Sequence, residues 1–110
     1  MSRESCGKLM LPFKRVQKMN TVGNLWLYIL SLLAKRSVYG YELQKVISKK
    51  FDFKLGKITS YRVLYRLQEE GFVKSKIKER KRIYEITEKG KREFKKAKEF
   101  YKNLVKTLCT

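Results

Sequence analysis

Apolar residues recur every three or four positions in three successive stretches, which is the spacing of α-helices that each bury one face. The first stretch covers residues 24–35 and opens on an asparagine, a common N-cap. Its apolar residues spread over most of the circumference, so we expect this helix to be buried on more than one side. The second predicted helix covers residues 38–51 behind Ser37 as a cap. The third covers residues 58–70, with Gly71 as its stop signal.

Gly40 stands in the first turn of the second predicted helix. Glycine is less favourable than alanine inside a helix by about 1 kcal/mol, so its position there requires a reason. Two explanations stay open at this point: another helix approaches this turn closely, or the turn is frayed.

The apolar period changes to two after Gly71, which is the period of a β-strand. Residues 73–78 and 83–87 both show this alternation, so we expect two antiparallel strands joined by a turn at residues 79–82. Four charged residues fill the turn: Glu79, Arg80, Lys81 and Arg82. Three lysines are expected to project from one face of the first strand: Lys74, Lys76 and Lys78.

A final helix is predicted after Thr87, which is a candidate cap. Its apolar residues form a stripe at helical spacing: Phe94, Ala97, Tyr101, Leu104, Val105 and Leu108. A domain of this size has little other surface to cover such a stripe. We therefore expect residues 88–110 to form the interface of a homodimer.

The first 20 residues hold five cations and one acidic residue among scattered apolar residues. Pro12 interrupts any long helix there, so we expect a flexible basic arm, with a short helix at residues 13–19 as an option. The predicted organisation is thus an arm at residues 1–20, a domain at residues 21–87 and the dimerisation helix at residues 88–110.

The strongly positive net charge indicates an anionic binding partner. The chain has 110 residues, 28 Lys and Arg against 10 Asp and Glu, a net charge of +18 and a pI near 10.1. Such a chain repels itself unless it meets an anion, and nucleic acid is the first candidate. An anionic membrane surface is the second candidate.

Several classes of protein and site are unexpected. The longest apolar-rich run, residues 25–34, is about half of the ~20 residues that a membrane span needs, and no secretory leader is recognisable, so we expect a cytoplasmic protein. There is no histidine, and Cys6 and Cys109 lie near opposite ends without CxxC spacing. No carboxylate pair, activated nucleophile or phosphate loop is arranged for chemistry. We expect neither an enzyme, a metal site nor a cofactor.

Three helices followed by a hairpin is the order of a winged helix-turn-helix domain, and three motifs resemble the PadR family of transcriptional regulators. YGYEL at residues 39–43 is similar to the family's HGYEL, with tyrosine in place of histidine. YRVLYRLQEEGFV at residues 61–73 resembles its third helix, YPLLKRLEEEGLI, with arginine in place of proline. RKRIYEITEKG at residues 80–90 resembles its RKYYRLTEKG wing. The resemblance covers roughly residues 25–108 and does not include the basic arm.

The resemblance implies a mainly α protein with a small β-hairpin that binds duplex DNA as a homodimer, and we expect a repressor. Helical spacing turns one face of the third helix outward, where it can enter a major groove. From that helix the expected DNA contacts are Lys57, Thr59, Tyr61, Arg62, Tyr65 and Arg66. From the wing they are Lys78, Arg80, Lys81 and Arg82, which would meet phosphates or the minor groove.

Other interpretations remain beside this one. A sequence-tolerant architectural DNA-binding protein would suit the charge of +18. From a different class, the domain could be a protein-interaction module or could lie on an anionic membrane. In some PadR-like regulators an aromatic pocket at the dimer interface binds a planar effector, and the resemblance indicates Trp26 and Tyr28 as candidates for it.

Overall fold

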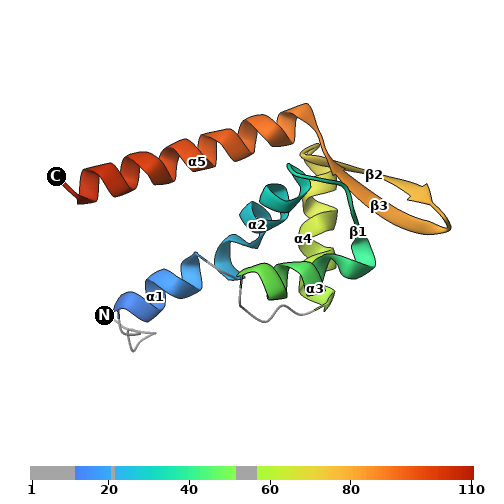
Figure 1. Ribbon diagram of the computed structural model, residues 1–110, viewed down its shortest axis with the longest axis horizontal. Helices are drawn as coiled ribbons and strands as arrows, with labels where there is room; N and C mark the ends of the chain where they lie inside the picture. The colour runs from blue at the N-terminus through green and yellow to red at the C-terminus, as the bar shows by residue number, and fades with distance from the viewer. Residues whose placement is uncertain (1–11, 21, 52–56) are drawn as a thin grey trace.

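The computed structural model describes residues 12–20, 22–51 and 57–110, and Figure 1 shows their arrangement. The first eleven residues of the predicted arm, with Cys6, lie outside this range. In chain order the elements are α1 (Pro12–Met19), η1 (Val22–Asn24), α2 (Leu25–Leu33), β1 (Val38–Tyr39), α3 (Gly40–Phe51), α4 (Lys57–Glu69), β2 (Val73–Lys78), β3 (Lys81–Ile86) and α5 (Glu88–Leu108). Three helices carrying a β-hairpin and followed by a long helix are the order predicted from the sequence.

The core lies where α2 meets α3, α4 and the sheet. Helix α2 contributes five buried side chains, which explains why its apolar residues cover most of its circumference. Helices α3 and α4 and the three strands supply the remainder of this cluster: Leu43, Ile47, Leu64, Leu67, Val38, Val73 and Tyr84. The predicted burial of this helix on more than one side is therefore present in the structure.

The second predicted helix starts two residues later than expected. Val38 and Tyr39 form the short strand β1, which pairs with Tyr84 and Ile83 of β3, so the sheet has three strands in the order β1-β3-β2. Ser37 is therefore not the cap. Instead, Glu42 Oε1 accepts a hydrogen bond from the Tyr39 backbone N–H at 3.2 Å, which is the carboxylate half of a capping box.

The hairpin turn is also tighter than predicted. Strands β2 and β3 pair from Val73 with Ile86 to Lys78 with Lys81, which leaves two residues in the turn. These residues, Glu79 and Arg80, have φ angles of 53° and 64°. Positive φ at both positions is typical of the type I′ turn, whose twist matches that of the strands. Lys81 and Arg82 therefore belong to β3.

Helix α5 begins at the predicted cap. The Thr87 hydroxyl oxygen accepts a hydrogen bond from the Gly90 N–H at 3.0 Å, and the same hydroxyl donates to the Gly71 carbonyl at 2.6 Å. Gly90 is buried against the turn after α4, where an added Cβ would lie 2.1 Å from the Phe72 carbonyl oxygen. Glycine at this position lets α5 start directly beside the end of α4.

Helices α1 and α5 both extend away from the core toward the same side of the molecule (Figure 1). The radius of gyration is 15.9 Å, compared with about 13 Å for a compact domain of this size. Tyr101 links α5 to the segment between α1 and α2. Its hydroxyl accepts a hydrogen bond from Asn24 Nδ2 and donates one to Asn20 Oδ1, both at 2.9 Å. The Tyr28 hydroxyl donates to the Asn20 carbonyl in the same cluster. The optional short helix in the arm is present as α1 and has proline at its first position, where proline is tolerated.

Candidate nucleic-acid interface

Helix α4 has one buried and one exposed side, as its spacing predicted. Ser60, Leu64 and Leu67 are buried against the core. The opposite side exposes Ile58, Thr59, Arg62, Tyr65, Arg66 and Glu69 to solvent. Tyr61 lies at the boundary, with 37% of its surface exposed. Lys57 begins the helix, but its side chain lies outside the described part of the structure.

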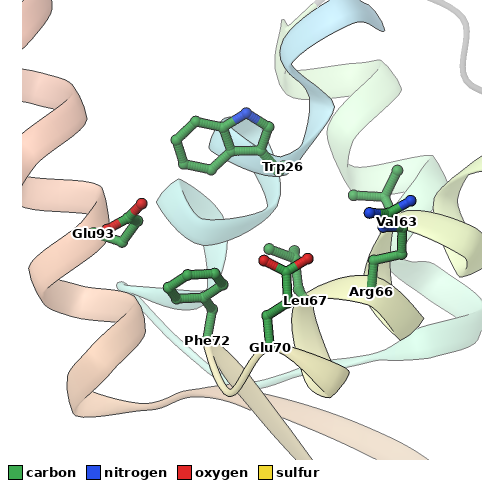
Figure 2. A pocket seen from close by; sticks show the side chains of 7 residues that line it. All are labelled: Trp26, Val63, Arg66, Leu67, Glu70, Phe72 and Glu93. Carbon is green, nitrogen blue, oxygen red and sulfur yellow. The ribbon is translucent and has the colours of Figure 1, made fainter.

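Arg66 differs in position from the other expected contacts on α4. It belongs to a stripe with Val63, Leu67 and Glu70 at spacings of three and four residues, and this stripe lines a hollow toward α2 and α5 (Figure 2). Arg62 and Tyr65 lie nearer the middle of the exposed face. The structure therefore separates Arg66, at the edge, from the residues best placed to meet a groove.

The wing cations lie at three different places. Arg80 is in the turn. Strand register places Lys81 on the same face as Lys78, its cross-strand partner. Arg82 is on the other face, where its Nη1 donates to Ser75 Oγ at 2.9 Å, and the Ser75 hydroxyl donates in turn to Gln68 Oε1 of α4 at 3.1 Å. Arg82 thus connects the wing to α4, while Arg80 and Lys81 remain at the tip.

Glu85 partly neutralises the lysine face of the wing. Its carboxylate lies 2.9 Å from the Lys76 ammonium and 3.9 Å from that of Lys74. The hydrogen bond from Lys76 and the charges of both lysines lower the pKa of Glu85 below its usual range. This carboxylate therefore stabilises the fold above its ordinary pKa of about 4.3, and the contribution is lost as pH falls. Nearer the tip, Lys78 faces Lys81 across the strands, a like-charge pair that an external anion would relieve.

A hollow of about 360 Å³ lies between α3, α4 and the wing, and its lining combines tyrosines with wing cations: Gly40, Tyr41, Tyr61, Lys81, Arg82 and Tyr84. The Lys81 ammonium lies 4.9 Å from the centre of the Tyr41 ring. A Cβ on Gly40 would lie 2.9 Å from the Tyr84 ring and 3.2 Å from the Tyr61 ring. Close approach therefore explains this glycine, and the rings that approach come from β3 and α4. Sequence reasoning missed Tyr41; its signal was an aromatic residue on the exposed side of the second helix.

Trp26 and Tyr28 do not share a pocket among the described residues. They are two positions apart on α2 and so point to different sides of the helix. Trp26 lines hollows next to α4 and α5. Tyr28 lines another hollow, of about 490 Å³, together with Asn20, Leu27, Ser31, Phe94, Lys98 and Tyr101. Within one chain, Trp26 and Tyr28 therefore do not contact the same bound molecule.

The apolar stripe of α5 divides into two halves. Phe94, Ala97 and Tyr101 are half-buried, and Phe94 packs against the core of the same chain. Leu104 and Leu108 are 40% and 76% exposed, and the stripe also leaves Val105 uncovered. Sequence reasoning omitted one residue of this surface, Phe100, which is 64% exposed. Helix α1 adds a second uncovered apolar face: Phe13, Val16 and Met19.

Within the described ranges, no three His, Cys, Asp or Glu residues are grouped so that they could hold a metal ion. No helix in the part of the chain that the structure covers has the length and apolar character needed to cross a membrane.

Comparison with known proteins gives a consistent result. Residues 29–96 match the profile of the transcriptional regulator PadR-like family. A transcriptional regulator from Clostridium thermocellum is 33% identical, with a TM-score of 0.71 over 78% of this chain and 87% of that chain. A PadR-like transcriptional regulator from Bacillus cereus is 28% identical, with a TM-score of 0.71 over 84% and 92%. PadR of Bacillus subtilis, solved with operator DNA, is 25% identical, with a TM-score of 0.61 over 66% of this chain and 45% of that chain. No curated protein matches the chain.

Proposed function

The chain belongs to the PadR-like family of transcriptional regulators, winged-helix proteins that are not enzymes, and we propose that it acts as a cytoplasmic, homodimeric repressor. Helix α4 of each subunit reads a half-site in the major groove, and the wing holds the neighbouring backbone or minor groove. Transcription is reduced because the bound dimer occupies the site that polymerase would use.

The observation that carries this proposal is the exposed face of α4 beside a cationic wing. Arg62 can donate two hydrogen bonds to a guanine, and Thr59 can contact a base edge or a thymine methyl group. The hollow between α4 and the wing offers the Tyr61 hydroxyl and the Lys81 ammonium to a phosphate that passes between them. The solved complex of Bacillus subtilis PadR with operator DNA supports the same use of this fold.

The uncovered faces of α1 and α5 support the proposed dimer. The Tyr101 hydroxyl bonds to Asn20, which follows α1, and to Asn24, so the end of α1 lies beside α5. A second copy would cover Leu104, Val105 and Leu108 together with Phe100, and would meet the apolar side of α1. The cations of α1 would remain on its outer side: Lys14, Arg15 and Lys18.

Selection of bound fragments from random duplex DNA tests the proposed function. The purified protein is incubated with the fragments and an excess of nonspecific competitor, and the retained DNA is sequenced through several rounds. A regulator should enrich a palindromic site, because a two-fold dimer reads two related half-sites. Retention without enrichment would instead support a sequence-tolerant architectural protein, which the net charge of +18 also favours. Absence of retention at low salt would contradict both.

A further inference from the structure

The turn of the wing contains an acidic residue in a region where the proposed function needs positive charge. Glu79 and Arg80 are the two residues of this turn, and both have positive φ. Glycine, asparagine and aspartate are the usual residues at such positions, so the backbone conformation does not explain a glutamate. Its carboxylate would also repel any phosphate that comes within about 10 Å at 0.1 M salt. A wing that binds DNA therefore has to keep this charge away from the backbone of the duplex.

A tyrosine from a distant part of the chain contacts this carboxylate. The Tyr39 hydroxyl donates a hydrogen bond to Glu79 Oε2 at 3.4 Å, and the two residues are 40 positions apart in the sequence. Partial removal from water, and then the charge of Glu79, raise the pKa of Tyr39. The hydroxyl therefore keeps its proton and remains the donor in this hydrogen bond.

The backbone of Tyr39 is fixed by two neighbouring elements. Tyr39 is the last residue of β1 and pairs with Ile83 of β3. Its N–H donates to Glu42 Oε1 at the start of α3, at 3.2 Å. Because both the sheet and α3 hold its backbone, Tyr39 can hold the turn of the wing in one direction.

A second tyrosine contacts the charge on the other side of the turn. The centre of the Tyr41 ring lies 5.7 Å from that of the Tyr39 ring, and the Lys81 ammonium lies 4.9 Å from the Tyr41 ring centre. Glu79 and Lys81 flank Arg80 in the sequence. Within the described ranges, the Arg80 side chain has neither a hydrogen bond nor an ion pair. The two tyrosines thus hold both neighbours of Arg80 and leave Arg80 itself available.

We propose that Tyr39 is a positioning residue for DNA binding: its hydroxyl keeps the Glu79 carboxylate beside the start of α3, so that the turn presents Arg80 to phosphates. The inference rests on the proposed function, because it concerns how the wing meets the duplex. Without the hydroxyl, the carboxylate would turn toward the phosphates or pair with Arg80. Either movement weakens binding to every duplex alike, since Glu79 reads no base in the held position.

A double-mutant cycle tests this role. Tyr39→Phe removes the hydroxyl and keeps the ring beside Tyr41. It should weaken binding to the selected and to random duplex about two- to fivefold at low salt, with a smaller loss as salt rises. In a Glu79→Gln background the same change should cost less than about 1.5-fold, because no charge is left to release. Equal losses in both backgrounds would assign Tyr39 to a direct DNA contact or to the fold, and no loss in either would remove it from DNA binding; both results overturn the proposal.

The effect of the carboxylate itself is compared with that of a distant one. Glu79→Gln alone should raise the affinity less than about twofold, as should Glu99→Gln, which removes the same charge from an exposed position of α5. In the Tyr39→Phe protein, Glu79→Gln should restore the lost affinity and Glu99→Gln should not. A large gain from Glu79→Gln in the wild type would show that the held carboxylate already opposes DNA, which would overturn the proposal.

Nitrogen-15 relaxation of the free protein tests the contact in the absence of DNA. Tyr39→Phe should increase the fast motion of the Glu79 and Arg80 amides and leave that of Ser75, in the paired part of β2, unchanged. A turn that moves as in the wild type would overturn the proposed contact. A wild-type protein that binds no duplex would contradict the proposed function and, with it, the role of Tyr39 in DNA binding, while a loosened turn in the variant would still establish the contact.

Discussion

Arg62 and the wing cations Arg80 and Lys81 occupy different surroundings, which predicts different effects of their loss. Arg62 lies on the exposed face of α4, where base edges are within reach in a major groove. Arg62→Ala should cost about 1–3 kcal/mol on the preferred duplex and much less on random DNA. The double change Arg80→Ala, Lys81→Ala should weaken both duplexes together and make the slope of log K against log salt shallower by roughly 0.9 per lost phosphate contact.

Binding isotherms for the two variants on both duplexes, at several salt concentrations, check this assignment. A wing variant that loses sequence preference, beside an Arg62→Ala variant that loses affinity uniformly, would exchange the two roles. Arg82 is omitted because it holds Ser75, so its removal would also loosen the wing.

Removal of the Glu85 charge should increase the affinity for DNA. Its carboxylate holds Lys76 and Lys74, so Glu85→Gln should release both lysines. If this face of the wing meets DNA, binding to random duplex should tighten, and the salt slope should steepen by roughly 0.9 for each lysine that gains a phosphate. Glu99→Gln adds the same charge on exposed α5 and serves as the control. Equal gains in the two variants would place the lysine face away from the DNA.

Replacement of the buried Gly90 should lower the stability of the fold and leave the exposed surface unchanged. A Cβ at this position would stand 2.1 Å from the Phe72 carbonyl oxygen, which also accepts the Thr87 N–H. Gly90→Ala should therefore lower the free energy of unfolding by about 3 kcal/mol, as overpacking against backbone does. Lys95→Ala, exposed on the same helix, should change it by no more than about 0.5 kcal/mol. Urea unfolding followed by circular dichroism measures both; similar stabilities would contradict the close approach.

At the scale of elements, the outer half of α5 predicts the oligomeric state. Leu104 and Leu108 are exposed in one chain, so Leu104→Glu with Leu108→Glu should leave the monomer folded and place unpaired charges in the proposed interface. In sedimentation velocity we expect the wild type to form the proposed dimer and the variant to remain monomeric at the same concentrations. The control pair Asn103→Glu, Thr110→Glu adds the same charge off the apolar stripe and should remain dimeric. A dimer that persists in the leucine variant would move the interface elsewhere.

Elements with local causes could be predicted from the sequence, and elements with distant causes could not. The exposed face of α4 and the Thr87 cap follow from spacings within one segment, and the structure contains both. Strand β1 was missed because Val38 and Tyr39 pair with residues of β3 that lie far along the chain. Sequence reasoning assigned the whole apolar stripe of α5 to a dimer interface. Its inner half packs instead against α2 of the same chain, which lies more than 50 residues earlier in the sequence. Trp26 and Tyr28 were grouped by residue type, although their spacing separates them.

At the scale of the whole molecule, Lys and Arg outnumber Asp and Glu by 28 to 10, and some of the acidic residues lie close to cations. Glu85 lies on the wing, and Glu70 and Glu93 lie at the hollow between α2, α4 and α5. A net charge of +18 accelerates encounter with any polyanion and gives no preference for sequence. In the proposed function, discrimination comes from the few neutral or bidentate contacts of α4, so we expect preference for the selected site to increase as salt weakens nonspecific binding.

The Tyr101 cluster has a consequence for local unfolding. It links α5 to Asn20, directly after the eight-residue helix α1, and the apolar face of α1 is uncovered in one chain. A helix this short is not stable in water by itself. Backbone amides of α1 should therefore exchange with deuterated solvent more slowly as protein concentration rises through the range of dimer formation, while amides of buried α2 respond much less. Mass spectrometry of peptides after timed exchange would measure this change in deuterium uptake. Slower uptake in α1 at higher protein concentration would indicate that association of two subunits stabilises this helix.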